Sequence, residues 1–222
     1  MFDNFNLYEF LLSMVALIIC ITIHEFAHAL SAYKAGDDTP RAQGRISLNP
    51  IDHLDPMGTI MMVVSSMAGF GIGWGKPVRI NPYNFRSPRW DNLKVSLWGP
   101  LSNILFAAVI GCVLRFWWQS FSHPLLNFLV TLTFINISLA VFNLIPVSPL
   151  DGSHILSSLL PYEAARRYDY FMARHGLLVF LGLIFFGSSI LPVILGPPTH
   201  LLWSLVTWHQ GGEILMRLYA GL

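Results

Sequence analysis

The sequence His24-Glu25-Phe26-Ala27-His28 lies at the end of an apolar run that begins near Leu7. Residues four apart on a helix share one face, so the two imidazoles can bind a single metal ion. Glu25 lies about 100° around the helix from His24, within reach of a water on that ion, as the general base of a zinc hydrolase does. Two neutral histidines hydrogen-bonded inside a helix bundle are the alternative interpretation of the same pattern.

The composition is that of an integral membrane protein. Of the 222 residues, 54% are hydrophobic and 11% are charged, and the mean hydropathy is +0.57, whereas soluble domains carry about 25% charged residues. An ionisable side chain such as Glu25 is costly at membrane depth, and a bound cation would offset that cost. The basic residues are scattered and the net charge is +1, which gives no indication of nucleic-acid binding.

Apolar runs of about 20 residues can cross a bilayer as helices. We therefore predict a single all-α membrane domain over residues 1–222, a bundle of about four to six transmembrane helices. Cys20 and Cys112 lie in apolar runs, where small buried side chains are expected rather than a disulfide. The expected helices are residues 7–35, 91–118, 124–144 and 176–195, and a less regular run at 199–218 that either crosses the membrane or lies at its surface.

Residues 36–90 do not form one span. Residues 44–48 and 77–81 alternate as strands do, so a small β-hairpin is expected between the first two core helices. The apolar piece 57–74 is broken by Gly69, Gly71 and Gly73, which favours a re-entrant helix or loop over a full crossing.

The distribution of basic residues predicts the orientation. Of the 13 lysines and arginines, eight lie from Lys34 to Lys94 and three more from Arg166 to Arg174. If residues 36–90 stay on one side, all of these face the same compartment, which the positive-inside rule makes the cytoplasm. His24, about 25 Å along the helix from Leu7, then lies in the cytoplasmic half of the membrane.

A catalytic zinc site usually has three protein ligands and leaves one position for water. Asp151 is the candidate third ligand, because it follows a helix broken by Pro146 and Pro149 and lies at the same predicted membrane level as His24. An aspartate before an apolar run is also typical of a helix N-cap, here for a short helix from Gly152. The two roles are compatible.

Three separated motifs resemble the site-2 protease family of intramembrane zinc metalloproteases, and the resemblance covers residues 21–156. The compact bacterial-type members, without PDZ or CBS modules, are the more similar ones. They also carry stretches like Gly44-Arg45-Ile46-Ser47-Leu48-Asn49-Pro50 and His53-Leu54-Asp55-Pro56. The three motifs are His24-Glu25-x-x-His28, Gly99-Pro100-Leu101-Ser102-Asn103 and Asn143-x-x-Pro146-x-x-x-Leu150-Asp151-Gly152.

The resemblance implies one zinc ion held by His24, His28 and Asp151, with Glu25 as the base that activates water. It implies an endopeptidase that cleaves transmembrane protein substrates, in regulated intramembrane proteolysis or in clearance of membrane segments. It also implies a multi-pass protein in the plasma membrane of a prokaryote, with its active site toward the cytoplasm and with membrane lipid and a protein substrate as partners.

Three further residues have expected supporting roles. The resemblance implies that Asn143 helps bind the substrate or the tetrahedral intermediate, and that Asn103 supports packing around the site. His53 is expected to stabilise a polar loop, with a role beside the metal or as a ligand in an inhibited state as the alternative. Residues 44–48 and 78–81 could grip an unwound substrate as an added strand, or form a structural hairpin that shields the site.

Two other functions use the same cluster. A membrane metal-ion transporter or binding protein could employ the His-Glu-His-Asp set as a transit site, but transporters typically show internal repeats, and none is visible here. A catalytically silent scaffold has no reason to keep a costly carboxylate beside two imidazoles.

Overall fold

The computed structural model describes residues 6–67, 74–187 and 189–220, and all regular secondary structure in these ranges is helical. Four helices are long and apolar enough to cross a membrane, which supports a multi-pass protein. They are α1 (Leu7–Ala35), α4 (Pro88–Trp117), α5 (His123–Asn143) and α7 (Tyr162–Phe186). The shorter helices are α2 (Thr39–Ala42), α3 (Pro56–Met67), α6 (Asp151–Leu159), α8 (Leu191–Thr207) and α9 (Gly211–Ala220), with single 3-10 turns at Pro50–Asp52, Pro82–Asn84, Trp118–Ser120 and Trp208–Gln210.

The predicted β-hairpin is not supported. Neither 44–48 nor 77–81 is a strand, and the β-bridge in the described part of the chain is a single antiparallel one, between Leu54 and Gly75. The physical reason is that the polar groups of the 75–81 segment bond to other partners, including a side chain of α1. α3 has 12 residues, fewer than the ~20 that a crossing needs; the glycines at 69, 71 and 73 lie outside the described residues.

Helix prediction was accurate for the core and wrong at the carboxyl end. α1 has the predicted bounds, and α4 and α5 begin and end within a few residues of theirs. α7, however, starts at Tyr162 rather than residue 176, because its first turns are charged yet still helical, a stretch that a search for apolar runs misses. α8 then runs through Pro197 and Pro198, where the sequence had indicated a boundary.

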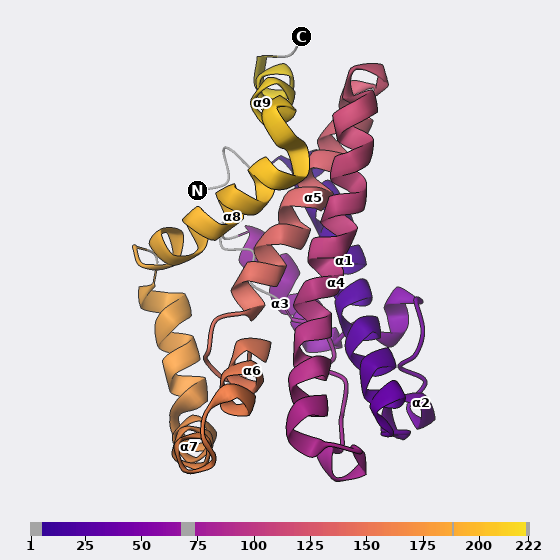
Figure 1. The fold of residues 1–222 in the computed structure, drawn as a ribbon. Helices are drawn as coiled ribbons and strands as arrows, with labels where there is room; N and C mark the ends of the chain where they lie inside the picture. Colours follow the sequence, from indigo (N-terminus) through magenta and orange to yellow (C-terminus); the bar gives the residue numbers. More distant parts are fainter. Residues whose placement is uncertain (1–5, 68–73, 188, 221–222) are drawn as a thin grey trace.

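Three helices form the core of the bundle. α1, α4 and α5 contact one another along their lengths, and Figure 1 shows them grouped together. α6 packs between α4 and α7, while α8 crosses over α5 and leads to α9 (Figure 1). The largest core cluster of buried apolar side chains is Ala16, Cys20, Ile110, Leu114, Leu126, Val130, Leu132 and Ile214.

Local capping fixes both ends of α1. The Asn6 side chain accepts hydrogen bonds from the N–H groups of Tyr8 and Glu9, which satisfies two of the free donors of the first turn. At the other end Gly36 adopts a φ of 112°, a left-handed conformation that favours glycine and ends the helix. The two caps therefore fix the length of α1, and with it the position of His24 and His28 along the helix.

Asp37, immediately after α1, ties the following segments to the end of the helix. Its carboxylate is buried and accepts hydrogen bonds from the N–H and hydroxyl of Thr39, the side-chain amide of Asn84 and the N–H of Asn81, at 2.6–3.1 Å. Burial raises the pKa of Asp37, but these hydrogen bonds to the ionised form outweigh it, so the pKa is lowered from its usual value. The carboxylate is thus a charged anchor for residues 37–84.

We expect Asp37→Asn to destabilise the protein by about 1–3 kcal/mol, because an amide has one accepting oxygen where the carboxylate has two. Thermal unfolding in detergent measures the effect. Because folding lowers this pKa, the stability that Asp37 contributes is present above about pH 4 and is lost as the pH falls further. Asp38→Asn is the matched control, since the Asp38 side chain is 70% exposed; an equal loss in both variants would contradict the anchor.

Candidate metal centre

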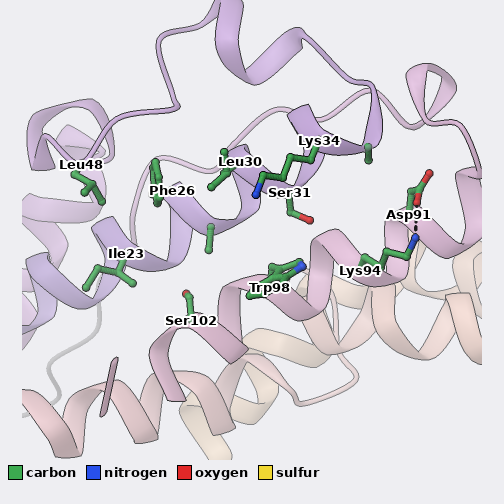
Figure 2. A pocket seen from close by; sticks show the side chains of 12 residues that line it. Ile23, Phe26, Leu30, Ser31, Lys34, Leu48, Asp91, Lys94, Trp98 and Ser102 are labelled. Carbon is green, nitrogen blue, oxygen red and sulfur yellow. Dashed lines mark hydrogen bonds and ion pairs between the residues drawn. The ribbon is translucent and has the colours of Figure 1, made fainter. Parts of the chain in front are cut away.

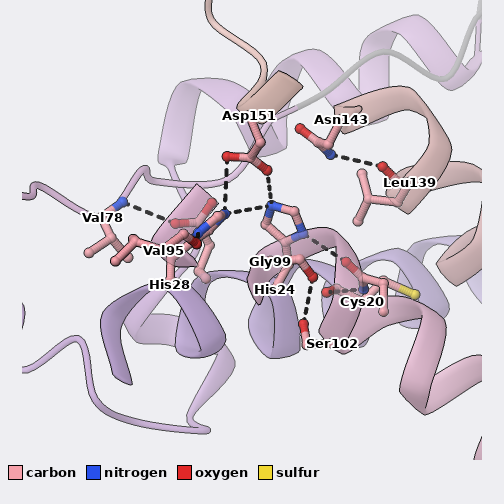
Figure 3. A network of polar contacts seen from close by, with 12 residues as sticks. Cys20, His24, His28, Val78, Val95, Gly99, Ser102, Leu139, Asn143 and Asp151 are labelled. Atoms are coloured by element: carbon pink, nitrogen blue, oxygen red, sulfur yellow. Dashed lines mark hydrogen bonds and ion pairs between the residues drawn. The ribbon is translucent and has the colours of Figure 1, made fainter. Parts of the chain in front are cut away.

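Three potential ligand groups meet where α1 passes the start of α6. His24 Nε2 lies 3.1 Å from Asp151 Oδ2, His28 Nε2 lies 3.2 Å from Asp151 Oδ1, and the two Nε2 atoms are 3.0 Å apart. One ligand atom from each residue lies within 4.8 Å of the others. Figure 3 shows both imidazoles turned toward the Asp151 carboxylate. The structure thus brings together two residues of one motif and a carboxylate from the other side of the bundle.

The far nitrogen of each ring is fixed by an acceptor on α4. His28 Nδ1 lies 2.8 Å from the carbonyl oxygen of Val95, which can only accept, so this nitrogen carries the proton. His24 Nδ1 lies 2.7 Å from the side-chain oxygen of Asn103. In the neutral ring each Nε2 then has a lone pair directed at Asp151 and its partner imidazole, the form in which histidine binds a metal.

Asn103 is itself held by a buried network. It has no exposed surface, and its amide nitrogen donates to the Cys20 carbonyl at 3.0 Å and to the Asn136 side-chain oxygen at 2.8 Å. Asn136 in turn donates to the Leu132 carbonyl. These donor assignments leave the Asn103 oxygen as the acceptor for His24. Asn136 is not among the predicted site residues, although an asparagine in the middle of an apolar span is a signal of this kind of network.

Gly99 lets α4 pass directly against the histidines. A Cβ at this position would collide with His28 Nε2 and lie 2.8 Å from His24 Cε1. The glycine of the Gly99-Pro100 motif therefore provides the space in which the two ring nitrogens meet.

Asp151 is the first residue of α6 and does not cap it. Leu150 occupies the N-cap position, and no side chain caps this helix end, so the N-cap interpretation is wrong. The two carboxylate oxygens of Asp151 lie 3.1 and 3.2 Å from the Nε2 atoms of His24 and His28. Its Oδ2 is buried and accepts no hydrogen bond from the described residues, which suits an oxygen that binds a cation.

The donor set fits zinc. Two imidazole nitrogens and one carboxylate oxygen are the ligand types of catalytic zinc sites, which keep a further position open for water. The chemistry of the three groups, their burial and the unsatisfied Asp151 oxygen all agree with such an ion.

Glu25 faces a different part of the structure. Its Oε2 accepts a hydrogen bond from the Val78 N–H at 3.0 Å and lies 3.8 Å from Arg45 Nη2. Burial lowers the pKa of Arg45, and the opposing effect of the Glu25 and Asp52 charges does not fully offset it. The 75–81 segment thus lies against the motif helix on the side of Glu25, as the hydrogen bond from the Val78 N–H shows.

The remaining predicted residues lie outside the cluster. The Asn143 side chain donates to the Leu139 carbonyl at 2.9 Å, one turn back in α5. His53 is fully buried, and its Nε2 lies 2.7 Å from the Ser47 carbonyl oxygen, as expected of a residue that stabilises the polar loop. Its alternative role as a metal ligand has no support from this position.

A pocket of about 540 Å³ opens between α1 and α4. Figure 2 shows Phe26 and Leu30 of α1 and Trp98 of α4 lining it, with Lys34 near one end. Neither His24 nor His28 lines this pocket. It is therefore separate from the metal centre.

A model of peptidase family M50 matches residues 118–183, a range that contains Asn143 and Asp151. The chain is 35% identical over 217 residues, 94% of its length and 91% of the relative's, to "Putative zinc metalloprotease YwhC" of Bacillus subtilis. It is 27% identical over 182 residues to "Putative zinc metalloprotease Rip2" of Mycobacterium tuberculosis, covering 82% of this chain and 69% of the relative.

A third relative matches over a shorter stretch. "Zinc metalloprotease MJ0392" of Methanocaldococcus jannaschii is 33% identical over 84 residues, 37% of this chain and 23% of the relative. No solved structure matches the chain.

We expect Gly99→Ala to weaken zinc binding by about 10- to 100-fold, because the new methyl group displaces the His28 ring from the position set by Val95. Metal analysis of the purified protein measures the bound zinc. Gly196→Ala is the control, since a Cβ there has no neighbour within 4 Å. A full complement of zinc in the Gly99 variant would contradict this account.

Proposed function

Since the chain belongs to peptidase family M50, the site-2 protease family of zinc metalloproteases, we propose that it is an intramembrane endopeptidase that hydrolyses peptide bonds of transmembrane proteins. The observation that carries the proposal is the convergence of His24, His28 and Asp151, with a helix long enough to cross a membrane supplying two of the three groups. Regulated intramembrane proteolysis and clearance of membrane segments are the two processes that such an activity serves.

We assign the metal ligands by geometry and chemistry. His24 and His28 each offer Nε2, and Asp151 offers a carboxylate oxygen. Bound zinc supplies a Lewis acid that polarises the scissile carbonyl and makes a water nucleophilic near neutral pH. The hydrogen bonds that the Nδ1–H groups donate to the Val95 carbonyl and the Asn103 side-chain oxygen keep the two rings in place.

Glu25 is the proposed general base. Its carboxylate accepts a proton from the attacking water as the water oxygen bonds to the carbonyl carbon of the substrate. The same proton then passes to the leaving amine nitrogen as the C–N bond breaks, which returns Glu25 to its ionised form. One carboxylate thus serves as base and then as acid.

A substrate helix must unwind before its carbonyl can be attacked, because its backbone groups are bonded to one another in the membrane. The extended 76–81 segment beside Glu25 is our candidate for holding the opened chain. The Val78 N–H is already bonded to Glu25 and the Asn81 N–H to Asp37. The N–H groups of Arg79 and Ile80 have no partner among the described residues and remain for the substrate.

We place the active site toward the cytoplasmic face of a prokaryotic plasma membrane. The carboxyl end of α1 carries His24 and His28, and the basic stretch from Lys34 to Lys94 begins at that end. The positive-inside rule assigns this end to the cytoplasm. We infer that residues 1–222 form one membrane domain that is surrounded by lipid.

We expect Glu25→Gln to abolish cleavage while zinc stays bound, because glutamine cannot accept the proton and Glu25 is not one of the proposed ligands. The assay uses purified protein and a reporter with a single transmembrane segment, with and without a zinc chelator. The wild-type protein should cleave the reporter and lose this activity with the chelator. Cleavage that resists the chelator, or metal flux across vesicles without cleavage, would contradict the proposal and favour a transporter.

We expect proline at position 79 or 80 to raise KM about two- to tenfold, as the loss of one hydrogen bond to the substrate predicts. Alanine at the same position is the matched control, since it shortens the side chain and keeps the N–H. The ratio of KM values between the proline and alanine variants is measured with the same reporter. If neither proline changes KM, the segment does not bind substrate through these amides.

A further inference from the structure

Arg45 is a buried guanidinium beside the proposed base. It lies after α2, and its side chain is 3% exposed. Its Nη2 donates a hydrogen bond to the Lys76 carbonyl and lies 3.8 Å from Glu25 Oε2. This single group therefore contacts both the motif helix and the segment that lies over it.

The burial of Arg45 is costly. Its Nε and Nη1 are buried and have no hydrogen-bond partner among the described residues. Unpaired buried donors oppose folding, and a contact that served stability alone could be replaced by a well-packed apolar side chain. The carboxylates of Glu25 and Asp52 are the charges that favour a cation here, and Glu25 is the one within 4 Å of the guanidinium.

Both contacts on Glu25 fall on the same oxygen. Oε2 accepts a hydrogen bond from the Val78 N–H and faces Arg45, whereas Oε1 makes no hydrogen bond or ion pair with the described residues. The Glu25 side chain keeps 15% of its surface exposed. A carboxylate held in this way has one fixed oxygen and one that is free to exchange a proton.

Arg45 also determines where the Val78 amide lies. The Lys76 carbonyl binds Arg45, and the Lys76 N–H donates to the His53 carbonyl at 2.8 Å. These bonds join residue 76 to the 45–53 loop. Val78, two residues further along, is thereby held at Glu25.

We propose that Arg45 is a positioning residue, which orients the Glu25 carboxylate directly through its charge and indirectly through the Lys76–Val78 backbone. The inference rests on the proposed function of Glu25 as the base. Arg45 touches neither substrate nor metal in this scheme, so its loss should slow turnover and leave substrate binding and zinc intact.

The test compares Arg45→Met and Arg45→Lys in the full-length protein, with Arg45→Gln as a second uncharged variant should the methionine variant fail to fold. For each protein we would measure kcat and KM with the single-span reporter, the zinc content, and the unfolding temperature. Arg41→Met is the matched control, because Arg41 is on the same segment and its side chain is 65% exposed.

The expected result is a kcat about 10- to 100-fold lower in the uncharged variant, with KM, zinc content and unfolding temperature close to wild type. Arg45→Lys should recover part of kcat, since it restores the charge, and Arg41→Met should behave as wild type. An unchanged kcat in the uncharged variant overturns the inference. The inference is also overturned if kcat falls only as much as the zinc content or the unfolding temperature falls, and if Arg45→Lys does not restore kcat. That pattern would mark a structural role for Arg45.

The outcome separates this inference from the proposed function. If the wild-type protein cleaves, Glu25→Gln is inactive and Arg45→Met is fully active, only the positioning role fails. If Glu25→Gln still cleaves the reporter, the assignment of the base fails, and the role of Arg45 fails with it.

Discussion

The Nε2 atoms of His24 and His28 face the same point because the Nδ1 side of each imidazole is held by a hydrogen bond. His28 is held by the Val95 carbonyl and His24 by Asn103, and both acceptors belong to α4. These hydrogen bonds select the tautomer that leaves Nε2 free as a ligand. Gly99, between them on the same helix, leaves room for the rings. The geometry of the candidate metal centre therefore depends on the α1–α4 contact as much as on the motif itself.

A polar site inside an apolar bundle needs a complete set of hydrogen bonds, because lipid offers none. Asn103 donates to the Cys20 carbonyl and to the Asn136 side-chain oxygen, and Asn136 donates to the Leu132 carbonyl, which connects α1, α4 and α5 through their buried sides. Such a network resists movement, since any displacement leaves a buried polar group unpaired. The helices that carry His24 and its support are held together by packing and by this network at once.

The two faces of the motif helix have different surroundings. On the histidine side the neighbours are helices, which hold the rings rigidly. On the Glu25 side they are the 45–53 loop and the extended 75–81 segment, joined by Arg45 and by the backbone of His53. A histidine cluster held by helices, next to a face built from loop segments, suits the proposed cleavage of an unwound substrate, with the proposed base between the two.

The sequence by itself determined what depends on local periodicity and apolar length. The bounds of α1, the shared face of His24 and His28, the four long helices and the membrane character all follow from residue spacing and hydrophobicity. Tertiary structure alone decided the rest, because contacts between distant segments have no local signal. The sequence had named Asp151 as a candidate ligand or an N-cap, and the tertiary structure decided between them by placing its carboxylate beside both imidazoles. The tertiary structure also determined the partners of Asn136 and Arg45, and it placed the 75–81 segment beside Glu25 where a hairpin had been predicted. The charged start of α7 was not predicted, because a helix makes its backbone hydrogen bonds internally and can extend beyond the apolar stretch from which it is predicted.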